Sequence, residues 1–93
     1  MKLGIENKVA LVSGGSKGIG RACAELLAEQ GCQVMVVARG IEGIEAGVQA
    51  IRAAGGRAAG VAADMSDASG VQRAVDATRE AFGAPDIVIS NVH

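Results

Sequence analysis

Residues 13–20, SGGSKGIG, place four glycines and a lysine directly after an apolar run. Glycine has no Cβ, so backbone N–H groups in such a loop can approach a phosphate closely. A helix that begins in the loop adds the positive end of its dipole to the same point. The stretch therefore predicts an anion-binding loop, in which Lys17 supplies a further positive charge.

The glycine spacing separates this loop from two other phosphate-binding motifs. A P-loop, GxxxxGK[ST], would run from Gly15 to Gly20, but the next residues are Arg21 and Ala22, so the lysine and the magnesium-binding hydroxyl are missing. The dinucleotide fingerprint GxGxxG has no match in any register. The spacing present is Gly14-x-x-x-Gly18-x-Gly20. The alternative without a ligand is that the glycines only allow tight packing of helix against strand.

The elements that must position this loop follow from the apolar pattern. Four β-rich apolar stretches predict strands, at residues 8–13, 33–38, 57–63 and 86–90. Helical periodicity lies between them: after the glycines up to Gly31, over 41–54, and from Val71 to Phe82. Strict strand–helix alternation with short connections predicts an α/β fold, a Rossmann-like parallel sheet of about four strands with helices on its faces.

Each predicted helix has an apolar stripe that we expect to face the sheet. The stripes of the first, second and third helix are Ile19, Cys23, Leu26 and Leu27; Ile41, Ile44, Val48 and Ile51; and Val71, Val75, Thr78 and Phe82. For the third helix, Ser66 or Ser69 is the predicted N-cap, and Ser69 with Gln72 fits a capping box.

Composition excludes several classes of function. Ninety-three residues suit one small domain. A net charge of −1 and a pI of 5.7 give no basic footprint for nucleic acid, and no apolar run approaches the ~20 residues of a membrane span. Cys23 and Cys32 lack metal-ligand spacing, so we expect reduced thiols and no metal site. Without a signal-peptide h-region at its start, the chain is expected to be cytoplasmic.

Three motifs in order resemble the short-chain dehydrogenase/reductase family. SGGSKGIG is similar to its TGxxxGIG loop, AADMSD (62–67) to its D-[VM]-[ST]-D segment, and FGAPDIVISNVH (82–93) to its F-G-x-x-D-x-L-V-N-N-A-G stretch. The resemblance runs along the whole chain and is nearest to the 3-oxoacyl-[acyl-carrier-protein] reductase type. It implies hydride transfer between a nicotinamide cofactor and a carbonyl or alcohol.

The end of the second strand indicates which nicotinamide cofactor would bind. In dinucleotide-binding folds an acidic residue there binds the ribose hydroxyls of NAD, but this chain has Ala38 followed by Arg39. A guanidinium can bind a 2′-phosphate, and Lys17 lies on the same side of the expected pocket. We therefore predict NADP(H). The alternative for Arg39 is a solvated charge at a strand end.

The resemblance assigns further residues to the cofactor site. Asp64 matches the acid that contacts adenine, with Met65 contributing its backbone N–H, although Asp64 could also cap the following helix. Asn91 matches the second asparagine of N-N-A-G, which borders the cofactor. The complete set of expected cofactor-binding residues is Gly14, Ser16, Lys17, Gly18, Ile19, Gly20, Arg39, Asp64, Met65 and Asn91.

The same resemblance shows what these residues lack. The family's chemistry uses a Tyr-x-x-x-Lys pair and a serine, and this sequence contains no tyrosine. We therefore expect residues 1–93 to be the N-terminal, cofactor-binding part of such an enzyme, with no catalytic residue of its own. The alternative is a free-standing, non-catalytic module that binds a nucleotide or self-associates. The fourth strand should lie at a sheet edge, through which self-association is expected.

Overall fold

The computed structural model describes residues 4–14 and 18–90 as four strands and three helices in strict alternation. The elements are β1 (Val9–Ser13), α1 (Gly18–Glu29), β2 (Gln33–Ala38), α2 (Ile41–Ala53), β3 (Arg57–Ala62), α3 (Ala68–Ala81) and β4 (Ile87–Ser90). The strands form one parallel sheet in the order β3-β2-β1-β4. The predicted fold class is confirmed, with element ends shifted by a residue at several positions.

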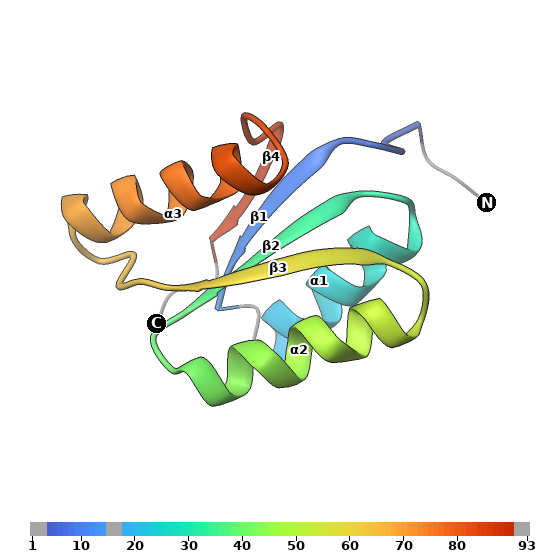
Figure 1. The fold of residues 1–93 in the computed structure, drawn as a ribbon, viewed down its shortest axis with the longest axis horizontal. Coiled ribbons are helices and arrows are strands. Elements are labelled where there is room, and N and C mark those ends of the chain that lie inside the picture. The colour runs from blue at the N-terminus through green and yellow to red at the C-terminus, as the bar shows by residue number, and fades with distance from the viewer. Residues whose placement is uncertain (1–3, 15–17, 91–93) are drawn as a thin grey trace.

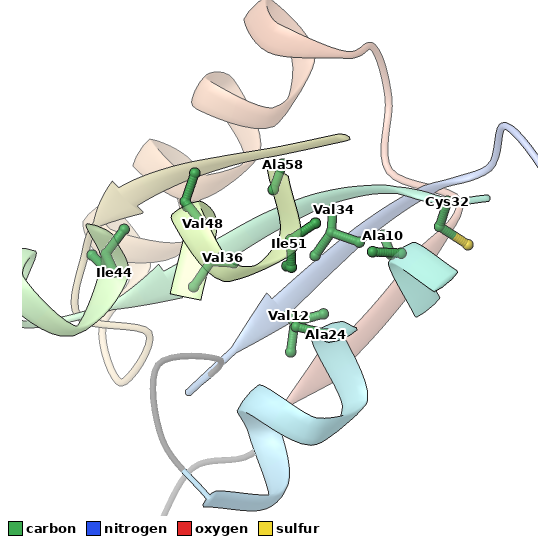
Figure 2. Packing of buried hydrophobic residues seen from close by; sticks show 11 residues of the cluster. Ala10, Val12, Ala24, Cys32, Val34, Val36, Ile44, Val48, Ile51 and Ala58 are labelled. Atoms are coloured by element: carbon green, nitrogen blue, oxygen red, sulfur yellow. The ribbon is translucent and has the colours of Figure 1, made fainter. Parts of the chain in front are cut away.

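The two central strands explain why helices cover both faces of the sheet. Every residue of β1 is buried, as are the four inner residues of β2. Helices α1 and α2 cover one face, and α3 covers the other (Figure 1). The larger cluster, between the sheet and α1 and α2, includes Val12, Ala24, Val36 and Ile51 (Figure 2). The smaller cluster, beneath α3, is built on Leu11, Met35, Val37 and Ala74.

Helix α1 faces the sheet with small residues. The predicted buried stripe is wrong at two of its four positions, because Ile19 and Leu26 are 75% and 56% exposed. Cys23 is half-buried, against an expectation of burial, and Leu27 packs only partly against the larger cluster. The buried positions are instead Gly20, Ala24 and Ala28. Residues this small let the helix lie close to the sheet. A search for periodic large apolar residues does not detect such a packing face.

Helix α2 packs mainly large apolar residues against glycines in and just before β3. Ile44, Val48 and Ile51 are buried as predicted, but Ile41 is 62% exposed, and Gly47 is buried on the packing face. A Cβ built on Gly60 of β3 would meet the Cγ2 methyl of Ile44. One built on Gly56 would lie 2.8 Å from Cγ2 of Ile51 and 3.2 Å from Cβ of Ala28. These glycines therefore set how closely the helices pack on the strands.

Helix α3 begins one residue after an aspartate cap. Asp67 Oδ1 accepts a hydrogen bond of 2.8 Å from the backbone N–H of Gly70, which makes Asp67 the N-cap in place of the predicted Ser66 or Ser69. Ser69 lies inside the helix, where its hydroxyl donates to the same Oδ1 at 2.8 Å. Gln72 donates to Asp76 and closes no capping box. On the packing face Thr78 is buried, whereas Val71 is 39% exposed.

No helix within the described ranges is long and apolar enough to cross a membrane. Both cysteines are free. The Cys32 thiol is buried and donates to the carbonyl oxygen of Ile5 at 3.4 Å; burial is the main cause that raises its pKa.

The cap on α3 makes stability depend on pH. The hydrogen bond from the Gly70 amide, followed by that from the Ser69 hydroxyl, lowers the pKa of Asp67 below its ordinary 3.8. A depressed pKa stabilises the fold above the unfolded-state pKa, and this contribution is lost as the pH falls through the lower folded-state pKa. We predict that Asp67→Ala lowers the melting temperature at neutral pH, whereas Asp67→Asn keeps most of the cap but removes its pH dependence. Thermal unfolding at neutral and strongly acidic pH measures both effects, and an unchanged neutral-pH melting temperature in Asp67→Ala would contradict them.

Candidate cofactor site

Parallel pairing brings the ends of all four strands to one edge of the sheet. Ser13, at the end of β1, pairs with Val37 on one side and with Ser90 of β4 on the other. Ala38 of β2 pairs with Ala62 of β3. The connections from β2 to α2 and from β3 to α3 therefore lie along one side of the molecule (Figure 1). Such an edge is where open parallel sheets bind their ligands.

The glycine loop leaves β1 at the centre of this edge. Gly14 has a φ of 73°, a backbone conformation that favours glycine, and its N–H donates to the carbonyl oxygen of Val37 at 2.8 Å. The predicted site residues Ser16 and Lys17 lie outside the described residues. Helix α1 then starts at Gly18, whose φ is 54°.

The first turn of α1 suits an anion. It contains no acidic residue, and its leading N–H groups have no partners within the helix. Gly18 and Ile19 are exposed there, whereas Gly20 is buried against the body of the domain. Exposed donors at the positive end of a helix are the chemical elements of a phosphate site.

Arg39 follows β2 directly and is exposed. Within residues 4–14 and 18–90 it forms no ion pair; the salt bridge of this part of the chain joins Arg21 to Glu25. Its positive charge nevertheless acts on Asp64, where it is one of the weaker causes that lower the carboxyl pKa. Because Ala38 and Ala62 pair at the ends of β2 and β3, Arg39 and Asp64 lie in the same part of the edge, where the guanidinium has no ion pair with the described residues.

Asp64 lies in the turn between β3 and α3 and is held by its neighbour. Its Oδ1 accepts hydrogen bonds from the Ser66 amide at 2.9 Å and from the Ser66 hydroxyl at 2.6 Å. These two bonds, the hydroxyl first, are the main cause of its lowered pKa. Asp64 is therefore ionised at neutral pH. Because Asp67 caps α3, the alternative role of Asp64 as that helix's cap is wrong.

Contacts with β2, with the smaller core cluster and with α3 also hold this turn in place. The Ala63 N–H donates to the Ala38 carbonyl at 2.9 Å, which continues the sheet pairing to the residue before Asp64. Met65 is half-buried and packs against the smaller core cluster. A Cβ built on Gly70 would meet the carbonyl oxygen of Asp64 and lie 2.6 Å from its carbonyl carbon. The first turn of α3 therefore rests directly on the Asp64 backbone.

Sequence reasoning missed two residues of this arrangement. Ser66 was expected to be a helix cap but binds the Asp64 carboxylate. Gly70, which no motif singled out, packs against the same residue. The D-x-S-D spacing contains part of the signal for Ser66, since an aspartate carboxylate often accepts a hydrogen bond from the backbone N–H two residues on. Asn91, the last predicted site residue, lies outside the described residues.

The described part of the chain contains no group of three or more His, Cys, Asp or Glu side chains that could hold a metal ion.

Comparison with known proteins gives these features a context. A family model described as short chain dehydrogenase matches residues 8–92. An uncharacterized oxidoreductase of Methylorubrum extorquens is 46% identical over 88 residues, which are 94% of this chain and 36% of that protein. The short-chain reductase protein NovJ of Streptomyces niveus is 44% identical over 85 residues, which are 91% of this chain and 32% of that protein.

Solved structures agree with the sequence relatives. L-sorbose reductase from Gluconobacter frateurii, complexed with NADPH and L-sorbose, superposes with a TM-score of 0.94 at 35% identity, over 100% of this chain and 36% of that one. A short-chain dehydrogenase/reductase from Burkholderia phymatum in complex with NAD gives a TM-score of 0.86 at 34% identity, over 90% of this chain and 30% of that one. The chain spans about a third of the length of the curated relatives that it matches.

Proposed function

Because the chain belongs to the short chain dehydrogenase family, we propose that residues 1–93 form a cofactor-binding part that holds the adenosine-phosphate side of NADP(H). The observation that carries this proposal is the convergence at one sheet edge of the α1 N-terminus, Arg39 and Asp64. In it, α1 receives the pyrophosphate, Arg39 the 2′-phosphate and Asp64 the adenine. Ser16, Lys17 and Asn91 complete the site on the strength of the family motifs.

The choice between the two nicotinamide cofactors rests on charge. Solved relatives include complexes with NADPH, NADP and NAD, so family membership alone leaves both cofactors open. A carboxylate at the end of β2 would repel a 2′-phosphate, whereas this chain has a half-buried Ala38 and then an exposed Arg39 that forms no ion pair within residues 4–14 and 18–90. A guanidinium binds phosphate oxygens through charge-assisted hydrogen bonds, which favours NADP(H).

We predict that the chain binds NADPH more tightly than NADH and that Arg39→Ala weakens NADPH at least about tenfold while leaving NADH unchanged, because only NADPH has a phosphate for the lost guanidinium. Isothermal titration calorimetry measures both affinities. Arg79→Ala is the matched control, since it removes the same charge from an exposed residue in the last turn of α3. Equal affinities in the unmodified chain, or an unaltered preference in Arg39→Ala, would overturn the assignment.

For the parent reaction, we propose hydride transfer between NADP(H) and a carbonyl or alcohol, of the 3-oxoacyl-[acyl-carrier-protein] reductase type, in the cytoplasm. The nicotinamide would supply or accept the hydride. The residues of this chain would bind and orient the far end of the cofactor. The proton donor would have to come from outside residues 1–93, which contain no tyrosine.

The isolated 93-residue chain is therefore predicted to have no carbonyl reductase activity, even with NADPH bound. NADPH absorbance followed with a panel of ketones and 3-oxoacyl thioesters measures this. As a control, calorimetry must first show that the same protein preparation binds NADPH, because a misfolded chain would also show no turnover. Cofactor oxidation above background by purified chain would show that these residues carry a catalytic group.

A second proposal concerns β4, which is an outermost strand of the sheet. It includes the alternative of a self-associating module. Within the described residues β4 pairs only with β1, and its Val88 side chain is 60% exposed. An apolar edge strand with unpaired backbone groups is a template for pairing with another chain. We propose that isolated copies associate through this edge.

Sedimentation velocity is expected to show dimers or larger species whose population rises with concentration. Val88→Lys should shift the chain toward monomer, because a charge on the edge strand disfavours pairing. Val71→Lys is the control, since it places the same charge on another exposed valine, in α3. A strictly monomeric unmodified chain would contradict the proposal.

A further inference from the structure

Ser66 places both of its donors on one oxygen of Asp64. The amide N–H and the hydroxyl of Ser66 both reach Oδ1, at 2.9 Å and 2.6 Å. Oδ2 accepts no hydrogen bond from any residue in 4–14 or 18–90. The carboxylate therefore has one satisfied and one available oxygen, an asymmetry that a freely rotating aspartate would not have.

The backbone beneath this carboxylate has little room to adjust. Gly70 packs so closely on Asp64 that any side chain there would meet the Asp64 carbonyl. On the other side, the Ala63 amide N–H donates a hydrogen bond to the carbonyl oxygen of Ala38, in β2. Because the main chain is held from both sides, the direction of the Asp64 carboxylate depends mainly on its own side-chain torsions. Ser66 restricts those torsions.

We propose that Ser66 is a positioning residue for base recognition: its two hydrogen bonds to Oδ1 of Asp64 reserve Oδ2 to accept from the exocyclic amino group of adenine. This inference rests on the proposed cofactor site and deepens it. Adenine carries a donor at this position, whereas hypoxanthine carries a carbonyl acceptor. A reserved carboxylate oxygen therefore binds the first and repels the second.

The test compares NADPH with its hypoxanthine analogue, in which the adenine amino group is replaced by a carbonyl oxygen. Calorimetry on the 93-residue chain should give about tenfold tighter binding of NADPH, since one charge-assisted hydrogen bond is exchanged for an unpaired acceptor. Ser66→Ala should reduce this ratio to about threefold or less, because the carboxylate keeps only the amide bond at residue 66. Ser66→Thr, which retains a hydroxyl, should restore the ratio.

Two further variants separate positioning from a general structural effect. Ser69→Ala is the matched control, because the Ser69 hydroxyl donates to the neighbouring Asp67 at 2.8 Å, and its loss should leave the ratio unchanged. Asp64→Asn should reverse the preference toward the hypoxanthine analogue. In that variant Ser66 would keep the amide oxygen on its own side, so that the amide nitrogen donates to the base. This reversal remains a test if Ser66→Ala does not fold, as judged by circular dichroism.

These measurements separate a failure of the role proposed for Ser66 from a failure of the proposed cofactor site. If the unmodified chain binds neither dinucleotide, the proposed cofactor site is wrong, and the role of Ser66 is wrong with it. If both bind but the ratio is near one, or if Ser66→Ala keeps the full ratio, only the role of Ser66 is overturned. A changed ratio in Ser69→Ala would likewise contradict it, because the effect would then belong to the turn as a whole.

Discussion

The parallel pairing of two central strands with buried inner residues is the constraint on which the rest of this structure depends. With β1 and β2 apolar on both faces, helices must cover both sides of the sheet, and each connection must return the chain to the same starting edge. The carboxyl ends consequently collect at the opposite edge, together with the N-terminus of each helix. The same burial that stabilises the strands therefore also brings together the loops of the cofactor site we propose.

At the carboxyl ends of the strands, different contacts hold each of the described loop residues. The glycine loop is tied to β2 through the Gly14 amide. The turn after β3 is held by its own serine and aspartates and by the close packing of Gly70. Arg39, in contrast, is exposed and has no ion pair with the described residues. In the function we propose, these hydrogen-bonded groups would hold the parts that both cofactors share, and Arg39 would bind the 2′-phosphate that only NADP(H) carries.

The fold could be predicted from the sequence because the strands carry an unambiguous signal: VALVS and QVMVVA are too apolar for any but a buried position. Helix faces were predicted less well. Ile19 and Ile41 satisfy a helical period yet are exposed, whereas Gly20 and Gly47, which carry no hydrophobic signal, are buried. The cap of α3 was misassigned because the predicted caps, Ser66 and Ser69, lie within two residues of Asp67, and only the geometry shows that Asp67 reaches the Gly70 amide.

The small residues between helices and sheet also decide how this protein tolerates mutation. Truncation of Ala24 or Ala28 removes only a methyl group and opens almost no cavity, and Gly20 has no side chain to remove. Enlarging one must displace a helix from the sheet, as the contacts expected of a Cβ at Gly56 and Gly60 show. At these small positions the fold is vulnerable to overpacking, whereas the large residues of the same face, such as Val36 and Ile51, would leave cavities if truncated. Substitution at the small positions is confined to exchanges among the smallest residues, whereas Leu11 and Met35, under α3, can be exchanged for other large apolar residues.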